Sequence, residues 1–346
     1  VLGEFPKGVQ EVLIRLLEKP TGGRRPIGLY RAVVRLWARV RQAQVRSWER
    51  AEATHGMFSN GPNREVTDTV WRSCVRNAAA ADRGRTVLET LWDIKKCYEH
   101  VGHRGLQREA LLCRYPLGLL RVSVNTYRWG RWLLWDQDMV AEAVFPTRGI
   151  IAGSVFAVYE LKAFVMMALQ RFVARNPETG FSLHVDDAAQ NIEGDTPEEA
   201  IEQLRLSAED LKEVFEVELG LPLAGDKAML VGPSHKAVLQ AARCLGDLGG
   251  APMVSVKKLG IDYDGGKRSG WKSTQRTRAK AMFKRISRVR RLGSKKHTHA
   301  KIFYAGLIPA TTYGSEVVPI GKHLTKRLRA EGARTKRVGR GVKPVP

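Results

Sequence analysis

The chain has 346 residues, 43% of them hydrophobic, so it can bury a large core and is not a disordered protein. No apolar run approaches the roughly 20 residues of a membrane span, which argues against a membrane-embedded protein. The net charge of +23 predicts a polyanionic partner, with nucleic acid the first choice.

The first predicted elements form a hairpin. Residues 11–18 have the pattern of an apolar strand, 19–23 are a turn by their Pro and Gly content, and 24–29 begin a return strand. Basic residues lie at its tip.

A helical pattern follows the hairpin. Val33, Leu36, Trp37 and Val40 recur at helical spacing and predict the apolar face of a helix. The arginines between them are expected on its solvated face.

The middle of the chain alternates irregularly between strands and helices, which favours an α+β fold over a doubly wound sheet. We expect helices over 64–81, 104–113, 117–134, 154–175, 196–219 and 234–247, and strands over 87–93, 181–185, 188–192, 227–231, 253–256 and 259–263.

The positive charge is concentrated at the C-terminal end. The last 80 residues, 267–346, contain 23 of the 58 Lys and Arg residues but only two of the 35 acidic ones. A helix over 274–292 has a basic face. A solvated tail is the alternative, but the apolar stretch 302–308 favours a folded module that binds nucleic acid.

Three aspartates end apolar strand patterns. Asp93 ends the strand 87–93, and Asp186 and Asp187 follow the alternating strand 181–185. Because Asp is disfavoured inside strands, we expect the doublet in a hairpin turn. Adjacent carboxylates repel unless a cation or a proton lies between them. Three such groups can hold two divalent cations that drive phosphoryl transfer, so the pattern predicts a nucleic-acid polymerase.

At these positions the chain resembles reverse transcriptases, in particular those of non-LTR retrotransposons and group II introns. The matching motifs follow the family's order over about residues 10–320. They are the fingers hairpin (Lys19-Pro20 and Arg24–Ile27), the first catalytic motif (Asp93–Val101), the segment before the palm helix (Arg148–Ser154), the aspartate doublet (Val185–Asp187), the lysine motif (Asp226-Lys227), the primer grip (Lys258–Ile261) and a segment after the thumb (Tyr313–Val317).

The resemblance implies an α+β right-hand polymerase with fingers, palm and thumb, in which the palm sheet is antiparallel and the thumb is helical and basic. The fingers would be residues 1–86, with 103–145 inserted after the first palm strand. The palm would be 87–266, and 267–346 would be the basic thumb and a C-terminal extension.

It also implies the reacting groups. Asp93, Asp186 and Asp187, with the carbonyl of Ile94, would hold two Mg²⁺ ions, for which Mn²⁺ could substitute. One ion would activate the primer 3′-hydroxyl and the other would hold the triphosphate. Lys227 would donate a proton to pyrophosphate, although a lone lysine is more often a solvated surface residue.

Further residues would bind the nucleotide. Lys19 and Arg25 would grip the triphosphate, although a basic surface turn explains them equally well. Tyr98 would clash with a 2′-hydroxyl and so select dNTPs; without the resemblance it reads as a core aromatic. Gly149 and Ala152 belong to the segment that would approach the nascent base pair.

We therefore expect a retroelement RNA-directed DNA polymerase that binds an RNA template, a DNA primer and dNTPs, with no membrane partner. Glu99, Ala152 and Val158 depart from the family's usual Asp, Gln and Pro, and they motivate the alternative of a decayed or domesticated relative that binds RNA without catalysis. An RNA-templated RNA polymerase is a third interpretation, which Tyr98 disfavours.

The cysteines indicate the compartment. Cys74, Cys97, Cys113 and Cys244 stand apart, without a CxxC pair or a zinc motif. We expect buried, reduced thiols in an intracellular protein, nuclear or cytoplasmic. The chain begins at Val1 rather than Met, as expected for a fragment.

Overall fold

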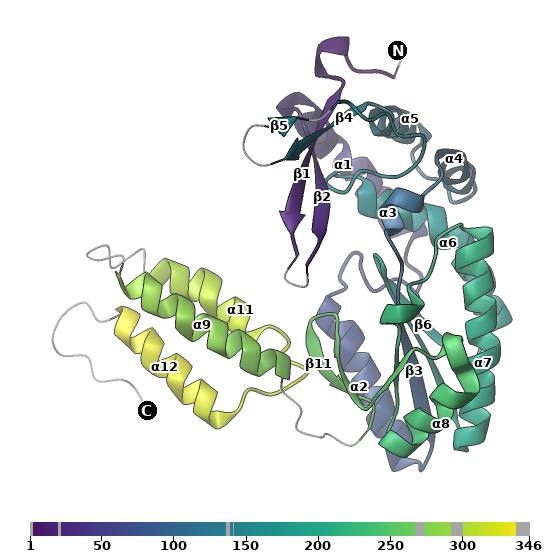
Figure 1. Ribbon diagram of the computed structural model, residues 1–346, viewed down its shortest axis with the longest axis vertical. Coiled ribbons are helices and arrows are strands. Elements are labelled where there is room, and N and C mark those ends of the chain that lie inside the picture. Colours follow the sequence, from purple (N-terminus) through teal and green to yellow (C-terminus); the bar gives the residue numbers. More distant parts are fainter. Residues whose placement is uncertain are drawn as a thin grey trace.

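The computed structural model describes residues 3–19, 22–135, 139–140, 142–266, 273–291 and 300–336. Its fold is α+β, as predicted, with two larger sheets, a small hairpin and a C-terminal group of helices (Figure 1). No helix within these ranges is long and apolar enough to cross a membrane. All four cysteines lie in these ranges and none is in a disulfide; Cys244 is exposed, contrary to the prediction of buried thiols.

A four-stranded sheet carries the N-terminal hairpin. Its order is β2-β1-β4-β5, with bounds β1 (Glu11–Glu18), β2 (Arg24–Tyr30), β4 (Gly130–Trp135) and β5 (Met139–Val140). The hairpin β1–β2 is antiparallel, as predicted, whereas β4 joins β1 in parallel. The hairpin extends from its sheet toward the side where β11 lies (Figure 1).

The predicted helix over 117–134 is wrong in its second half. Helix α5 (Leu117–Tyr127) ends at Arg128, and β4 follows from Gly130. The segment 130–135 pairs with β1, from Glu11↔Gly130 to Arg15↔Leu134. A partner 119 residues away therefore decides between helix and strand, and such a contact leaves no trace in the local pattern.

The predicted apolar face of the first helix is wrong for three of its four residues, and only Trp37 packs against the core. In α1 (Ala32–Glu52), Val33, Leu36 and Val40 are 52%, 66% and 67% exposed. The buried face is formed by Val34, Ala38, Val45, Trp48 and Glu49. Both faces carry apolar side chains, so spacing alone could not tell which one meets the core.

A five-stranded sheet forms the centre of the molecule, in the order β6-β7-β3-β8-β9. Its strands are β3 (Thr86–Asp93), β6 (Gly180–His184), β7 (Asp187–Gly194), β8 (Met229–Val231) and β9 (Ala251–Met253). The expected antiparallel sheet is mixed: β6, β7, β3 and β8 pair antiparallel, but β9 joins β8 in parallel. In sequence, helix α8 (His235–Leu245) lies between those two strands, and a helical crossover of this kind returns the chain so that the second strand runs parallel to the first.

Helices cover both faces of this sheet. One core contains Leu88, Ile192, Leu204, Leu230 and Ala241, which join the sheet to α7 (Pro197–Lys212) and α8. On the other face, Val70 of α2 (Val66–Asp82) packs with Val231, Val256, Ile261 and Tyr263. The strands β10 (Ser255–Lys258) and β11 (Ile261–Asp264), which form a separate hairpin, thus share this second face with α2.

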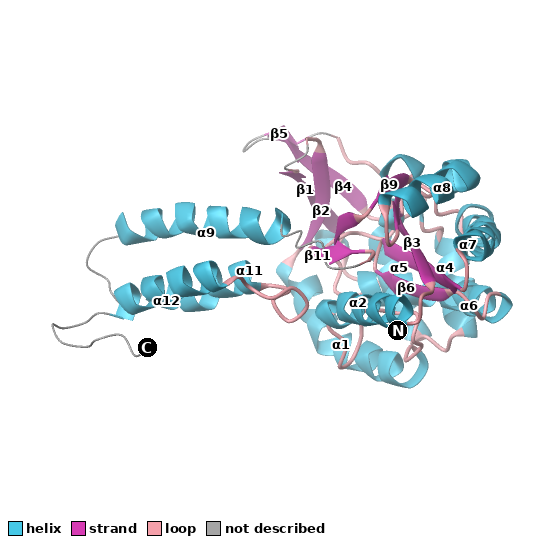
Figure 2. Ribbon diagram, turned by 90° about the horizontal axis from the view of Figure 1, so that it is seen from below, coloured by secondary structure: helices cyan, strands magenta, loops and turns pink. Residues whose placement is uncertain are grey.

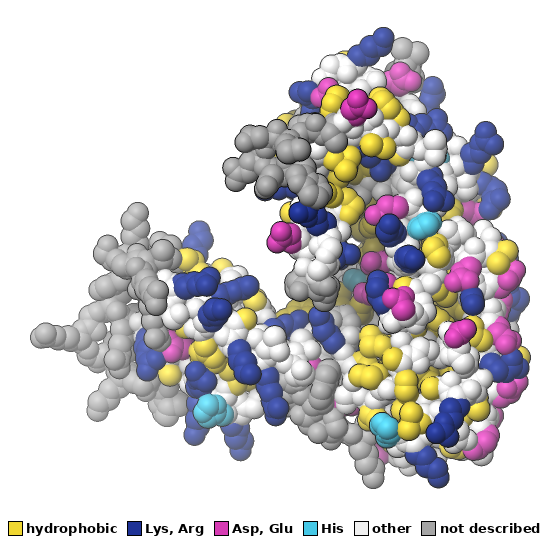
Figure 3. Space-filling view, viewed as in Figure 1, with side chains coloured by type: hydrophobic (Ala, Val, Ile, Leu, Met, Phe, Trp, Pro, Cys, Tyr) yellow, Lys and Arg dark blue, Asp and Glu magenta, His cyan; other side chains and the backbone are white. Residues whose placement is uncertain are grey.

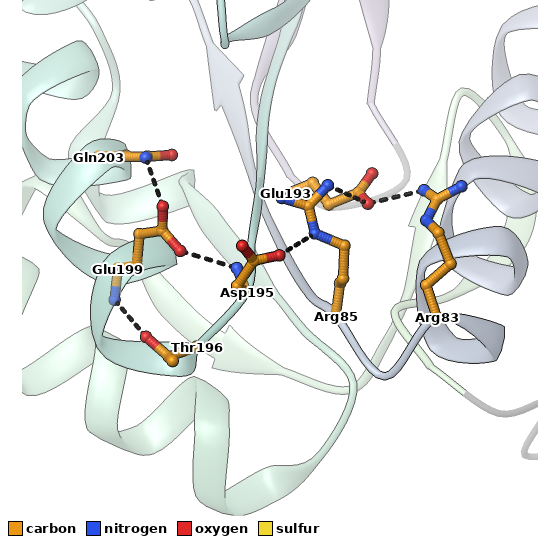
Figure 4. A network of polar contacts seen from close by, with 7 residues as sticks. All are labelled: Arg83, Arg85, Glu193, Asp195, Thr196, Glu199 and Gln203. Atoms are coloured by element: carbon orange, nitrogen blue, oxygen red, sulfur yellow. Dashed lines mark hydrogen bonds and ion pairs between the residues drawn. The ribbon is translucent and has the colours of Figure 1, made fainter.

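A polar network clamps the end of the sheet where β3 begins and β7 ends (Figure 4). Arg83 and Arg85 both pair with Glu193, at 2.7 and 3.0 Å, and Arg85 also contacts Asp195. Thr196 caps α7 by accepting a hydrogen bond from the Glu199 amide. The network lies next to Thr86↔Gly194, the first residue pair between β3 and β7. It therefore stabilises the pairing register of these strands, which places Asp93 opposite Asp187 at their other end.

The remaining helical elements complete the body. They are η1 (Lys7–Val9), α3 (Cys97–His100), α4 (His103–Leu112), α6 (Ala157–Arg175), η2 (Glu213–Glu218), η3 (Gly225–Lys227) and η4 (Gly246–Leu248). The long helix α6 is buried along most of its length, including Phe164, Leu169 and Phe172.

The C-terminal helices form an arm, which we call the basic bundle: α9 (Ser273–Arg291), η5 (Phe303–Leu307), α11 (Ile308–Thr312) and α12 (Lys322–Lys336). Figure 2 shows it projecting from the body. Its core contains Met282, Ile286, Phe303, Leu307 and Leu328. The apolar stretch 302–308 therefore belongs to a folded module, as predicted.

Candidate functional site

The three predicted aspartates lie at one end of the central strands of the sheet. Asp93 is the last residue of β3 and Asp187 the first of β7, and they face each other in the antiparallel register. The Ile94 amide donates a hydrogen bond of 3.2 Å to the Asp186 carbonyl. Side chains that face each other across a strand pair lie on the same face of the sheet, so residues far apart in sequence meet here.

The aspartate doublet begins in a hairpin turn: Asp186 is a turn residue, as predicted, whereas Asp187 is the first residue of β7. Strand β6 ends at His184 and β7 begins at Asp187, so Val185 and Asp186 are the turn residues. Val185 has φ +60°, a conformation that a β-branched residue rarely adopts. Strained backbone of this kind clusters at functional sites, and here it lies beside two of the predicted ligands.

The charges at this end of the sheet are coupled. Asp187 opens onto a cavity, but partial loss of hydration raises its pKa to about 6, and the neighbouring charges of Asp186 and Asp93 add to the shift. Burial raises the pKa of the Cys97 thiol below the site, with a further contribution from Asp186. The site therefore holds more negative charge than its surroundings neutralise.

Lys227 supplies one positive charge. Its Nζ lies 2.8 Å from Oδ2 of Asp93, and this hydrogen bond raises the pKa of Lys227. The residue lies in η3, just before β8, and not inside the strand predicted over 227–231. The Ala224 amide donates to the Asp93 carbonyl at 2.8 Å, which holds this segment against the end of β3.

The carboxylates fit a divalent cation only in part. In the portion of the chain that the structure describes, no three His, Cys, Asp or Glu side chains are gathered closely enough to hold a metal ion. Asp93 and Asp187 face the same cavity, whereas Asp186 is not among its lining residues. Loss of hydration and the charges of Asp186 and Asp93 raise the pKa of Asp187, and Asp186 would have to turn inward to share a ligand with it.

A cavity of about 190 Å³ adjoins the aspartates. Asp93, Asp187 and Lys227 line one side, and Lys257 and Leu259 of the β10–β11 hairpin line another. The remaining lining residues are Ser59, Leu91, Trp92, Ser182, His184, Ala188, Ala189, Met229 and Lys258. Acidic groups therefore meet basic and apolar walls, an arrangement suited to a ligand with both phosphates and rings.

Tyr98 and the loop that carries Gly149 and Ala152 form a second group of predicted residues, of which Tyr98 interacts electrostatically with Asp186. The Ile150 amide donates to the Tyr98 carbonyl at 2.8 Å. Gly149 has φ +95°, and a Cβ there would lie 3.3 Å from that carbonyl, so the position requires glycine. The Ala152 carbonyl accepts from the Gly28 amide at 2.7 Å, which ties this loop to β2.

Lys19 and Arg25 lie apart from the cavity. Both are exposed near the tip of the β1–β2 hairpin, where the Lys19 amide donates to Gly23 at 3.0 Å. Neither lines the cavity. The space-filling view shows a hollow between the part of the molecule that carries the β1–β2 hairpin and the basic bundle. Many Lys and Arg side chains lie on the surface of the bundle (Figure 3).

Sequence reasoning missed several buried polar residues around the site. His103 contacts the Gly149 carbonyl at 2.9 Å, Glu160 accepts from Tyr127, and Lys258 pairs with Glu89. Glu89 had a detectable signal, because a charge inside the apolar strand Val87–Trp92 needs a buried partner. Nothing in the sequence indicates which lysine that partner is.

No protein-family model matches the sequence, and no curated protein sequence matches it significantly. Among solved structures, apo telomerase from Candida tropicalis is 11% identical, with a TM-score of 0.53 over 94% of this chain and 62% of that one. Telomerase from Candida albicans, in complex with the TWJ fragment of telomeric RNA, is 11% identical, with a TM-score of 0.51 over 96% and 59%. The chain thus spans about three-fifths of these structures. At this identity the similarity shows a likeness of fold and nothing more.

Proposed function

We propose that the chain is an RNA-directed DNA polymerase of a retroelement of the non-LTR or group II intron type, which adds dNTPs to a primer 3′-hydroxyl. The observation that carries this proposal is the cross-strand pair Asp93↔Asp187, next to the strained turn that bears Asp186. It stands at the edge of a cavity in a reverse-transcriptase-like fold.

Asp93, Asp186 and Asp187, with the Ile94 carbonyl, are the proposed ligands of two Mg²⁺ ions. Bound there, such ions would lower the pKa of the primer hydroxyl and neutralise the triphosphate. Lys227, already beside Asp93, is the proposed proton donor to the leaving pyrophosphate.

The proposed nucleotide contacts come from two regions. Tyr98, supported from behind by Gly149, would exclude a 2′-hydroxyl and so favour dNTPs. Ala152 would lie near the nascent base pair, and Lys19 and Arg25 would reach the triphosphate once the hairpin closes on it. The RNA template and DNA primer would lie against the basic bundle, whose exposed cations suit a phosphate backbone.

The domain assignment also remains a proposal. Fingers over 1–86 with 103–145, palm over 87–266, and thumb with extension over 267–346 agree with the grouping of the four-stranded sheet, the five-stranded sheet and the basic bundle. Helix α2 packs on the central sheet despite its place before residue 87.

The test is primer extension on an RNA template with Mg²⁺. Asp186→Asn should reduce extension at least about 100-fold and leave salt-dependent RNA binding intact, since it removes one metal ligand and no phosphate contact. Asp247→Asn, an exposed acid of η4, is the matched control and should extend normally. Normal extension by Asp186→Asn would show that this residue is not a ligand.

A second candidate is an RNA-binding relative without catalysis. The Lys227–Asp93 ion pair favours it, because an ammonium group already neutralises one carboxylate, and Glu99 and Ala152 depart from the family pattern. Such a protein would retain RNA affinity but incorporate neither dNTPs nor rNTPs with Mg²⁺ or Mn²⁺ on any template. Incorporation of rNTPs alone would instead favour an RNA-templated RNA polymerase.

A further inference from the structure

The hairpin β10–β11 lies at the junction between the central sheet and the basic bundle, as both ribbon views show (Figures 1 and 2). Its two-residue turn has Leu259 at φ +47° and Gly260 at φ +83°. Leu259 is a bulky residue in a strained conformation, and with Lys257 it lines the cavity beside the aspartates. The hairpin is therefore a wall of the candidate site.

On one side the hairpin holds the basic bundle. The buried Asp262 carboxylate accepts hydrogen bonds from the amides of Thr274 and Gln275, at 2.8 and 3.0 Å, and so caps the first turn of α9. Tyr313 donates to the Leu259 carbonyl at 3.3 Å, and Arg278 stacks over the Tyr313 ring at 4.8 Å. These contacts join the bundle to the hairpin.

On its other side the hairpin is anchored by a buried ion pair. Nζ of Lys258 lies 2.6 Å from Oε1 of Glu89, and the two side chains are 3% and 2% exposed. Lys258 also donates to the Ser73 hydroxyl at 2.7 Å and lies 4.9 Å from the centre of the Tyr263 ring. Asn77 of α2 donates to the Tyr263 hydroxyl at 2.8 Å.

The anchor stands on the strand that carries Asp93. Side chains alternate along a strand, so Glu89, Leu91 and Asp93 point to the same face of β3. Leu91 lines the cavity together with Asp93 and Lys258. The hairpin is thus fixed directly to the strand that ends in a predicted ligand.

A buried ion pair is a poor source of stability, because the loss of hydration offsets most of the attraction. An apolar pair can give the whole protein as much stability, but it does not require one geometry, so the hairpin would shift and open more readily on the sheet. The buried pair specifies a single position of β10–β11 on the sheet, because any shift would leave two unpaired charges in the core.

We propose that Lys258 and Glu89 are positioning residues that set the place of the β10–β11 hairpin, and with it the basic bundle, relative to Asp93 and Asp187. The consequence for catalysis rests on the proposed polymerase function; the positioning itself does not. Loss of the pair should move the β10–β11 hairpin and the basic bundle, which are the proposed contacts of the primer–template. Tyr98 and Gly149, at the proposed dNTP site, should stay in place.

The direct test is hydrogen exchange of the full chain with Glu89→Gln, Lys258→Met, and the double variant Glu89→Leu with Lys258→Met. The amides of β10 and β11 should exchange at least about tenfold faster, with β6 and β7 unchanged. The apolar double variant keeps the core free of lone charges, so it tests positioning even where a single variant fails to fold.

The matched control is the second buried Lys–Glu pair of the body. Lys162 and Glu49 are 2.5 Å apart and 2% and 8% exposed, and Lys162 also donates to the Asn60 carbonyl; these contacts do not involve β10 or β11. Lys162→Met and Glu49→Gln should leave exchange in β10 and β11 unchanged. The proposal is overturned if these variants loosen the hairpin equally, or if the apolar double variant leaves its exchange at the wild-type rate.

If the wild-type chain extends a primer, the KM values of the variants provide a second test. Variants at Lys258 and Glu89 should raise KM for the primer–template about tenfold or more, with KM for dNTP within about twofold of wild type. A purely structural role would lower the active fraction and change neither KM. If the wild-type chain extends no primer, the polymerase proposal fails, whereas hydrogen exchange still decides the role of the pair.

Discussion

Single residues at the site respond to pH in a defined direction. The pKa of Asp187 is raised to about 6 because the carboxyl loses hydration beside Asp186 and Asp93. A proton and a divalent cation compete for that carboxylate, so acid should weaken cation binding well above the pH at which an ordinary aspartate is protonated.

We expect Mn²⁺ affinity to fall about tenfold per pH unit below pH 6 and to level off above pH 7. Titration by electron paramagnetic resonance between pH 5 and 8, without nucleic acid, measures it. Asp187→Asn should bind more weakly and lose this pH dependence, and Asp247→Asn should retain it. Affinity independent of pH in the wild-type chain would contradict the placement of Asp187 as a ligand.

Glu160 is a second residue with an unusual charge state. It lies fully buried in α6, and burial raises its pKa to about 7, although hydrogen bonds with Ser123 and Tyr127 oppose the shift. The unfolded chain releases this proton near pH 4.5, so the native state binds more protons between pH 4.5 and 7. Stability should therefore fall as pH rises through that window, by up to about 3 kcal/mol.

Glu160→Gln should remove this pH dependence. The variant should match the wild type near pH 5 and exceed it at pH 8, because only the wild type then buries a carboxylate. Urea unfolding at pH 5, 6, 7 and 8 provides the comparison. Parallel pH profiles for the two proteins would mean that Glu160 is not protonated in the native state.

Among the secondary-structure elements, the contact between β2 and the loop before α6 is especially close. Gly153 has φ +117°, and a Cβ there would lie 2.4 Å from the Gly28 carbonyl oxygen. A Cβ on Gly28 would lie 2.1 Å from Ile151. The two backbones approach so closely only because neither position has a side chain.

Gly153→Ala should therefore destabilise the protein by about 2 kcal/mol or more, through strain and the clash with β2. Gly118→Ala is the control: this residue lies in α5, where an added Cβ would have no other atom within 4 Å, and the change should be neutral or stabilise by up to about 1 kcal/mol. Thermal unfolding compares the two variants. Equal thermal unfolding midpoints for the two variants would show that the loop accommodates the added methyl group without strain.

For the molecule as a whole, the distribution of charge decides where a polyanion binds. Arg276, Lys280, Lys284 and Arg288 are exposed on α9 at intervals of four residues, opposite the buried Met282 and Ile286. Residues four apart lie on one face of a helix, so the four cations form a continuous row.

Changing all four to Gln should lower the affinity for an RNA–DNA duplex at least about tenfold. The slope of log K against log salt concentration should become less steep by about 3. Fluorescence anisotropy from 50 to 300 mM salt measures both. Changing Arg39, Arg41, Arg46 and Arg50, exposed on α1, removes the same charge and should have little effect. Equal losses in the two variants would mean that only net charge matters.

Much of the site could be predicted because its signals are local. An aspartate that ends an apolar strand, and a doublet after an alternating strand, are visible within a few residues of Asp93 and Asp186. The hairpin at residues 11–30 and the helix predicted from residue 196 were predictable for the same reason.

The sequence by itself determined the α+β class, the folded basic module and the aspartates that end β3 and begin β7. Only the tertiary structure decided that 130–135 is a strand, that the outward face of α1 carries Val33, Leu36 and Val40, and that Lys258 is the partner of Glu89. The physical reason is the same in each case. Strand pairing, the choice of buried face and the pairing of buried charges depend on residues distant in the chain, and local periodicity contains no information about them.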